Sequence, residues 1–119
     1  MNNKYEHVDL TYLEDMSNGN TRVMVEMIEI FNSQVPELIS KMKEYLQEEK
    51  LDALSRLAHK AKASAFIMGM REVAEDLKLL EISAKTDKKV EKKYHIIVAD
   101  IEKRFGFAME ELKNIATKL

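Results

Sequence analysis

Apolar residues recur three and four positions apart along most of the chain, and charged residues fill many of the positions between them. This spacing gathers the apolar side chains on one face of each helical segment and is typical of amphipathic helices. The pattern predicts a short helix from Asp9 through Met16, a long helix with apolar residues from Val23 to Leu46, and helices over about 51–68, 70–84 and 90–115. The predicted fold is therefore all-α, an antiparallel four-helix bundle with a short N-terminal cap helix.

Polar and glycine-containing segments separate the expected helices. Asp9 is placed to cap the first helix, and Asn18 or Asn20 can cap the second after a Ser-Asn-Gly-Asn break. Pro36 falls inside the apolar pattern of the second helix. Because the periodicity continues past this proline, we expect a kinked helix rather than two helices. Gly69 is the expected stop of the third helix.

The two longest helices have the most extended apolar stripes. The stripe of the second helix is predicted to comprise Val23, Met27, Ile30, Phe31, Val35, Leu38, Met42 and Leu46. The stripe of the last helix is predicted to comprise Val90, Tyr94, Ile97, Ile101, Phe105, Ala108, Leu112 and Ile115. We expect these side chains to form much of the core between the helices.

Length and composition favour a single cytoplasmic domain. A chain of 119 residues can bury one hydrophobic core, and we assign residues 1–8 to a tail and residues 9–119 to the domain. Because the chain has no cysteine, disulfides and thiolate ligands are excluded, and a formal net charge of −2 gives no basic field for nucleic acid. No apolar run is long enough to cross a bilayer, and the polar N-terminus does not resemble a signal peptide.

One histidine stands on the polar face of the third expected helix. The core-facing side of this helix is predicted to comprise Leu51, Leu54, Leu57, Ala58, Ala61, Ala65 and Met68. His59 projects on the order of 130° away from the centre of that cluster, so we expect it to be exposed. Ala63, one turn away, leaves space beside the imidazole, and Lys62 brings a positive charge within reach. Imidazole is a good nucleophile near neutral pH, although geometry alone favours an ordinary surface histidine.

The residues around His59 resemble the motif of histidine-containing phosphotransfer (HPt) domains. That family usually has a histidine, then a lysine at plus three, a glycine at plus four, a small residue at plus five and a glycine at plus ten that ends the helix. Lys62, Ser64 and Gly69 match these positions, whereas Ala63 stands where the family usually has glycine.

The resemblance covers about residues 9–84 by pattern and the last helix by architecture, and it implies a role for three residues. His59 would be the phospho-acceptor through Nε2, and Lys62 would stabilise the charge of the phosphoryl group. Glu81 matches a position where the family often has Gln or Glu, and it would accept a hydrogen bond from Nδ1–H of the imidazole. A solvated glutamate near a helix end is the other interpretation of Glu81.

The resemblance also implies a surface around His59 that contacts a receiver domain. This surface is expected to comprise Ser55, Arg56, Lys60, Ala63 and Phe66. Alanine is more stable than glycine in a helix by about 0.8–1 kcal/mol, but the methyl group of Ala63 lies where the partner approaches. We expect transfer to survive and its rate or partner choice to change. Phe66 is either an exposed contact for an apolar receiver helix or a residue packed against the cap helix, with packing slightly favoured.

By resemblance, the chain is a phosphocarrier without kinase activity of its own. It would accept a phosphoryl group from an aspartate of one response-regulator receiver domain and pass it to another, in a relay that includes a hybrid sensor histidine kinase. The alternative is a helical adaptor of the same fold that binds receiver or kinase domains without being phosphorylated. We expect a free-standing monomer without a cofactor of its own, with Mg²⁺ supplied by the receiver domain.

The remaining histidines do not predict a metal site. A di-iron bundle would need Glu-x-x-His pairs that face the core. Arg56 stands three positions before His59, and Glu91 stands four positions before His95, so neither pair has this spacing. His7 lies in the expected tail, and His95 is expected at the boundary of the core.

Overall fold

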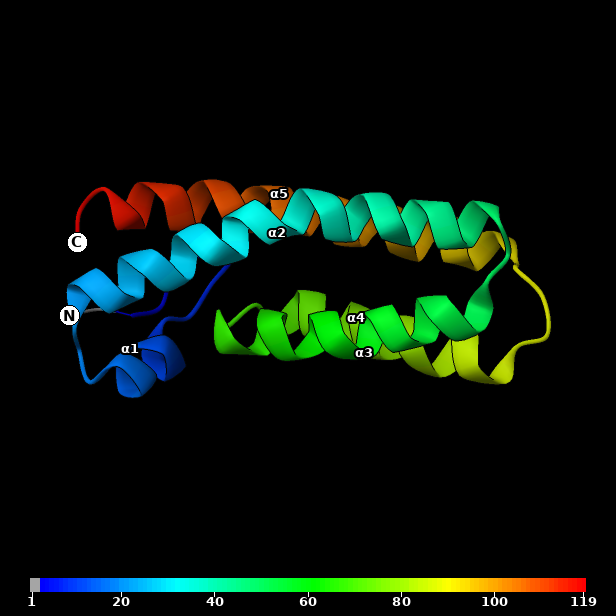
Figure 1. The fold of residues 1–119 in the computed structure, drawn as a ribbon, viewed down its shortest axis with the longest axis horizontal. Helices are drawn as coiled ribbons and strands as arrows, with labels where there is room; N and C mark the ends of the chain where they lie inside the picture. The colour runs from blue at the N-terminus through cyan, green and yellow to red at the C-terminus, as the bar shows by residue number, and fades with distance from the viewer. Residues whose placement is uncertain (1–2) are drawn as a thin grey trace.

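A computed structural model describes residues 3–119, and these residues form a helical bundle (Figure 1). The helices are α1 (Thr11–Ser17), α2 (Thr21–Gln47), α3 (Leu51–Ile67), α4 (Arg71–Thr86) and α5 (Lys92–Ala116). In Figure 1, the long helices α2 and α5 lie side by side in one layer, and α3 and α4 form the other. The short helix α1 continues the α3–α4 layer below the N-terminal part of α2. The predicted four-helix bundle with a cap helix is confirmed.

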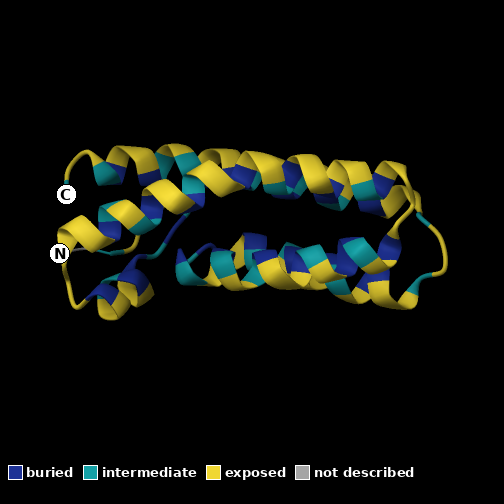
Figure 2. Ribbon diagram, viewed as in Figure 1, coloured by how far each residue is buried: buried dark blue, intermediate teal, exposed yellow. Residues whose placement is uncertain are grey.

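The core lies between the two layers, where the buried faces of the helices meet (Figure 2). Helix α3 buries small side chains, Ala58, Ala61 and Ala65, and packs most extensively against α4. Small side chains allow two helix axes to approach closely, so residues on the adjoining flanks of α3 and α4 come within hydrogen-bonding distance. This close packing positions the candidate site described below.

The buried face of α2 differs from the predicted stripe in the first half of the helix and again at Leu38, which is partly buried while Ile39 is buried. It comprises Met24, Ile28, Phe31, Val35, Ile39, Met42 and Leu46. The prediction is wrong for Val23 and Ile30, which are 37% and 57% exposed. In the first half of α2, two sets of apolar residues with the same spacing lie next to each other on the helix surface. Only the set that contains Met24 and Ile28 lies on the same face as Val35.

The last helix differs from its predicted stripe at two positions near its start. The buried residues of α5 are Tyr94, Val98, Ile101, Phe105, Ala108, Leu112 and Ile115. Val98 thus takes the predicted place of Ile97, and Val90 precedes the helix. The remaining six positions of the predicted stripe are buried as expected.

The second helix has its expected cap, whereas the predicted cap of the first helix by Asp9 is wrong. The side chain of Asn20 accepts a hydrogen bond from the backbone N–H of Val23 at 3.2 Å, which caps α2. The N-cap residue of α1 is Leu10, which has no side-chain cap, and the carboxylate of Asp9 just before it accepts the backbone N–H of Thr11 at 3.0 Å. Helix α2 continues through Pro36, and Figure 1 shows its axis bending partway along, which agrees with a kinked helix.

Gly69 ends α3 in a left-handed turn, as expected. Its φ is +65°, and its N–H donates to the carbonyl of Phe66 at 3.0 Å while the N–H of Met70 donates to that of Ala65 at 2.9 Å. This pair of bonds is a Schellman motif, which favours glycine at the left-handed position. A side chain at Gly69 would also clash with the backbone of Asp9. The glycine therefore serves both the turn and the close approach of the N-terminal segment.

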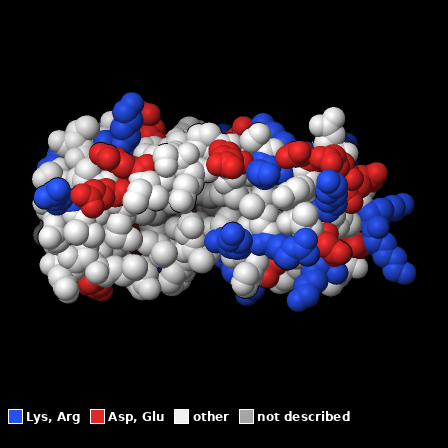
Figure 3. All heavy atoms as spheres, viewed as in Figure 1, with Lys and Arg blue, Asp and Glu red and all other residues white. Residues whose placement is uncertain are grey.

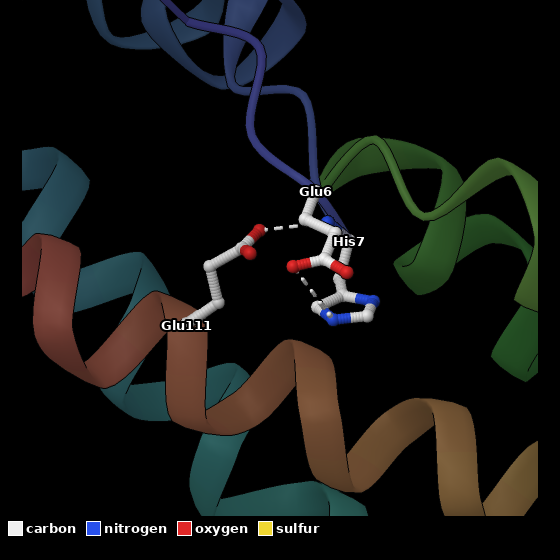
Figure 4. A group of neighbouring side chains, drawn as sticks. All are labelled: Glu6, His7 and Glu111. Atoms are coloured by element: carbon white, nitrogen blue, oxygen red, sulfur yellow. Dashed lines mark hydrogen bonds and ion pairs between the residues drawn. The ribbon is translucent and has the colours of Figure 1, made fainter.

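Residues 3–10, here called the N-terminal strap, cross the end of the bundle and bind to α5. Val8 is buried, and the carboxylate of Glu111 accepts the backbone N–H groups of His7 and Val8 at 2.9 and 3.0 Å (Figure 4). His7 and Val8 are therefore held against the bundle, which the predicted tail did not foresee, whereas Lys4, Tyr5 and Glu6 are exposed. Residues 1 and 2 lie outside the described part of the chain.

Candidate functional site

His59 lies on the flank of α3 that adjoins α4, and its side chain is 66% exposed. The predicted exposure is confirmed. Its Nδ1 lies 2.8 Å from Oε2 of Glu81 on α4. An ionised carboxylate only accepts hydrogen bonds, so this contact assigns the hydrogen of the neutral imidazole to Nδ1. The lone pair of the ring is then on Nε2.

Glu81 also binds the lysine that follows the histidine by one turn. Nζ of Lys62 lies 2.8 Å from Oε1 of Glu81, so the two oxygens of one carboxylate engage two different partners. The hydrogen bond from Lys62, and then that from His59, hold the pKa of the Glu81 carboxyl below its ordinary value against the opposing effect of desolvation. The side chain is only 19% exposed. Glu81 is therefore a bonded partner of both residues rather than a solvated glutamate.

Ser55 does not lie on the exposed surface where the sequence placed it. It is buried, and its hydroxyl donates to the main-chain carbonyl of Glu81 at 2.9 Å. The small side chain fits beneath α4 because the flank of α3 one turn before His59 faces the neighbouring helix. Ser55 thus fixes the backbone from which the Glu81 side chain reaches the imidazole.

The other expected contact residues lie at the surface of α3. Arg56, Lys60 and Ala63 are exposed, and Phe66 is 64% exposed. The ring of Phe66 also meets that of Tyr12 on α1 edge to face, with 5.7 Å between centroids. Phe66 therefore packs against the cap helix and still presents an open face, and its contact with a receiver stays a prediction. In Figure 3, basic side chains gather over α3, beside a largely uncharged area over α1.

A groove of about 560 Å³ lies between the N-terminal strap, α1 and the turn that joins α3 to α4. Tyr12 and Phe66 line it, and so do Arg71 and Arg104, but His59 does not. The groove thus begins where the exposed face of α3 ends and is separate from the imidazole.

Three possible metal ligands meet at the N-terminal strap, where the sequence predicted none. Ligand atoms of Glu6, His7 and Glu111 lie within 4.8 Å of one another (Figure 4). One oxygen of Glu111 already accepts two backbone N–H groups, and the ring of His7 stacks on Phe107 with 5.2 Å between centroids. These contacts account for the cluster as the anchor of the strap. No local signal predicts it, because Glu111 lies about a hundred residues away along the chain.

The fold and the site together define a class of protein, a helical bundle that presents one bonded histidine on its surface. The family model described as "Hpt domain" matches residues 26–116, which is most of the chain. The chain belongs to this family. Membership supports a phosphotransfer role in two-component systems and agrees with the resemblance found around His59.

Solved structures of two similar proteins show the same fold. Histidine-containing phosphotransfer protein B (HptB) from Pseudomonas aeruginosa PAO1 superposes with a TM-score of 0.87 at 20% identity, covering 98% of this chain and 99% of that one. The HPT domain from a sensor hybrid histidine kinase of Shewanella has a TM-score of 0.78 at 13% identity, covering 95% and 96%. No curated protein matches the sequence. Within the described residues, no helix combines the length and apolar character needed to cross a membrane.

Proposed function

We propose that this chain is a phosphorelay intermediate that accepts a phosphoryl group on His59 from one receiver domain and passes it to another. The observation that carries the proposal is the 2.8 Å contact between Nδ1 of His59 and Oε2 of Glu81 on an exposed side chain. This contact leaves Nε2 as the nucleophilic atom, and the chain that makes it belongs to the Hpt domain family.

The transfer step needs little machinery from the bundle. The lone pair of Nε2 attacks the phosphorus of an aspartyl phosphate, the P–O bond to the aspartate breaks, and its electron pair stays on the receiver's carboxylate. The hydrogen on Nδ1 remains in its bond to Glu81. No proton is gained or lost, so the step can run in either direction with the atoms balanced. The receiver would supply the aspartate and the Mg²⁺ that neutralises the transferring group.

The surface around His59 suits a protein partner rather than a small substrate. Arg56 and Lys60 can pair with acidic groups, and Phe66 offers an apolar contact. Ala63 lies one turn beyond His59, so its methyl group would lie at the closest approach of a receiver. The partners we propose are receiver domains and a hybrid sensor histidine kinase, in the cytoplasm, with the chain acting as a monomeric phosphocarrier and not as a kinase.

The other candidate function is an adaptor that binds receivers without being phosphorylated. Such a protein has no need for the ordered set of His59, Glu81 and Lys62, and this set favours the relay. A wild-type chain that binds several receivers but takes up no phosphoryl group from any of them would establish the adaptor.

Uptake of label from a phosphorylated receiver tests the site directly. Wild-type protein is expected to acquire acid-labile, base-stable label, and His59→Gln is expected to lose it completely. His95→Gln is the matched control, because His95 is another exposed histidine on a helix and should leave uptake unchanged. Label that persists in His59→Gln would refute the assignment of the phospho-acceptor.

A stability measurement guards that result against unfolding. His59 is largely exposed and carries little core energy, so His59→Gln should change the thermal midpoint and the helical circular-dichroism signal very little. A large fall in the midpoint would mean that the imidazole has a packing role, which the exposed geometry does not provide.

A further inference from the structure

The bonds that anchor the N-terminal strap leave several metal-binding atoms unused at the same place. Both anchoring N–H groups bond to Oε1 of Glu111, and among the described residues its Oε2 makes no hydrogen bond. The carboxylate of Glu6 and the ring nitrogens of His7 make none either, and Oε2 of Glu6 lies 3.8 Å from Nε2 of His7. Figure 4 shows the three side chains converging from the strap and from α5. Three groups with free lone pairs therefore meet at one place.

The two carboxylates of this cluster lack a lysine or arginine partner within the described part of the chain. Glu111 bonds to the two N–H groups of the strap, and Glu6 approaches only the ring of His7. Nζ of Lys103, on the same helix as Glu111, lies instead over the ring of Phe107, 6.0 Å from its centroid. A neutral imidazole adds a lone pair but no charge. A divalent cation would balance both negative charges and use all three ligand groups.

The geometry of the cluster is close to that which a metal ion requires. Ligand atoms around a tetrahedral Zn²⁺ lie about 3.4 Å apart, because the bonds to the metal are near 2.1 Å. The ligand atoms here lie within 4.8 Å of one another. The ring of His7 is held by its stack on Phe107, with 5.2 Å between centroids, and Glu111 is held by its bonds to the strap. The side chain of Glu6 is 83% exposed, so it can turn inward by the remaining distance.

We propose that Glu6, His7 and Glu111 bind one Zn²⁺ ion, or a chemically similar first-row divalent metal, with water at the remaining positions. Imidazole together with carboxylates suits these metals, whereas Mg²⁺ and Ca²⁺ prefer sets of oxygen ligands. The metal would join the strap to α5 through side chains in addition to the backbone bonds. Since Glu6 and His7 also line the groove beside α1, the metal would fix that wall of the groove. The site is independent of His59 and of the relay function.

Calorimetric titration of Zn²⁺ into chelator-treated protein without a polyhistidine tag tests the site. The titration uses the double variant His59→Gln/His95→Gln, because the chain has 3 histidines and exposed imidazoles bind zinc on their own. Only His7 then remains, and both replaced side chains are exposed, so the fold should be kept. We expect one zinc ion per chain, with a dissociation constant in the micromolar range. No saturable binding in that range would overturn the proposal.

Further substitutions in this background identify the ligands. Glu6→Gln and His7→Gln should each weaken zinc binding by at least about tenfold, because loss of even an outer-shell partner costs about 10–100-fold. Glu110→Gln, at an exposed position beside Glu111, should leave the affinity unchanged. The side chain of Glu6 takes no part in anchoring the strap, so Glu6→Gln should keep the thermal midpoint of the zinc-free background. Undiminished affinity in Glu6→Gln would overturn the proposal, and so would equally strong competition by Mg²⁺.

Hydrogen exchange in the strap locates the bound zinc independently of the affinities. The N–H groups of His7 and Val8 exchange when the strap detaches from Glu111, and a metal that joins the strap to α5 opposes this opening. At a free zinc concentration about ten times the dissociation constant, both groups should exchange about tenfold more slowly. Exchange rates that zinc leaves unchanged would show that it binds away from the strap and would overturn the proposal.

Discussion

Two of the carboxylates of helix α4, Asp76 and Glu81, meet charged groups on opposite sides of the helix. Glu81 faces α3, where hydrogen bonds from Lys62 and His59 hold its pKa below the ordinary value. Asp76 faces α5, where burial and then the hydrogen bond and charge of Asp100 raise its pKa to about 7. The same kind of group, on the same helix, is thus kept ionised at one place and drawn toward the protonated form at the other.

The difference follows from the number of donors available to each carboxylate. Glu81 has two nitrogen partners of its own, each at 2.8 Å. Asp76 shares Arg104 with Asp100 and Glu72, and the guanidinium lies 2.8 Å from Asp100 but 3.7 Å from Asp76. One oxygen of Asp76 is buried without a hydrogen-bond partner among the described residues. A carboxylate with few hydrogen-bond donors takes up a proton more readily, whereas one with several donors stays ionised and can take part in chemistry.

Replacing the shared cation of the acidic cluster should produce the largest effect on stability. Arg104→Met keeps an unbranched side chain but leaves the carboxylates of Glu72, Asp76 and Asp100 without their common partner. We expect the free energy of unfolding, measured in urea at pH 8, to fall by about 1–2 kcal/mol. The matched change Lys62→Met should cost less than about 0.5 kcal/mol, because it leaves a single carboxylate, that of Glu81, without its cation. Equal losses would remove the distinction between the two clusters.

Much of the fold could be predicted from local sequence, because the spacing of apolar residues in an amphipathic helix indicates which of its faces is buried. The spacing of apolar residues predicted each described helix, and Asn20 and Gly69 mark their ends as expected. The phase of α2 was wrong at Val23 because two adjacent stripes satisfy the same spacing. The N-terminal strap was missed because backbone N–H groups held by the distant Glu111 leave no local pattern.

Only the part of the candidate site that lies on a single helix could be predicted from local sequence. His59 and Lys62 are three positions apart, so helical geometry alone puts them on neighbouring positions. The place of Glu81 depends on how α4 packs against α3, and only the family resemblance suggested it. Ser55 was misplaced because its flank is buried by that packing. The cluster around Asp76 gave no signal, because charged residues on helix flanks resemble a solvated face.

Removing the titrating group of the acidic cluster should sharpen the comparison through its pH dependence. Asp76 has a pKa of 3.8 in its ordinary state and about 7 in the folded protein, so the folded protein binds a proton that the unfolded chain has released between these values. Its contribution to stability is full below pH 3.8 and is lost as the pH rises to about 7. Asp76→Asn should therefore be more stable than wild type by about 1 kcal/mol at pH 8 and nearly equal to it near pH 4, as measured by urea unfolding across this range. If Asp76→Asn keeps the wild-type dependence of the free energy of unfolding on pH, another group is responsible for that dependence.

The smallest expected effect is the stability change of Glu81→Gln, and its sign is opposite. Because the folded protein lowers the pKa of Glu81, the ionised carboxylate stabilises the fold above its ordinary pKa of 4.5, and that contribution disappears as the pH falls through the lowered value. Partly exposed pairs are weak, so we expect Glu81→Gln to be less stable than wild type by about 0.5 kcal/mol or less at pH 7, and equal to it near pH 3. Thermal unfolding at the two pH values, with Glu75→Gln as the charge-matched control, measures the difference. If removing Glu81 instead stabilised the protein at pH 7, the ionised carboxylates of Glu81 and Asp76 would both oppose folding. The site would then lower the stability of the fold and be kept for phosphoryl transfer, rather than being a favourable ion pair that also serves transfer.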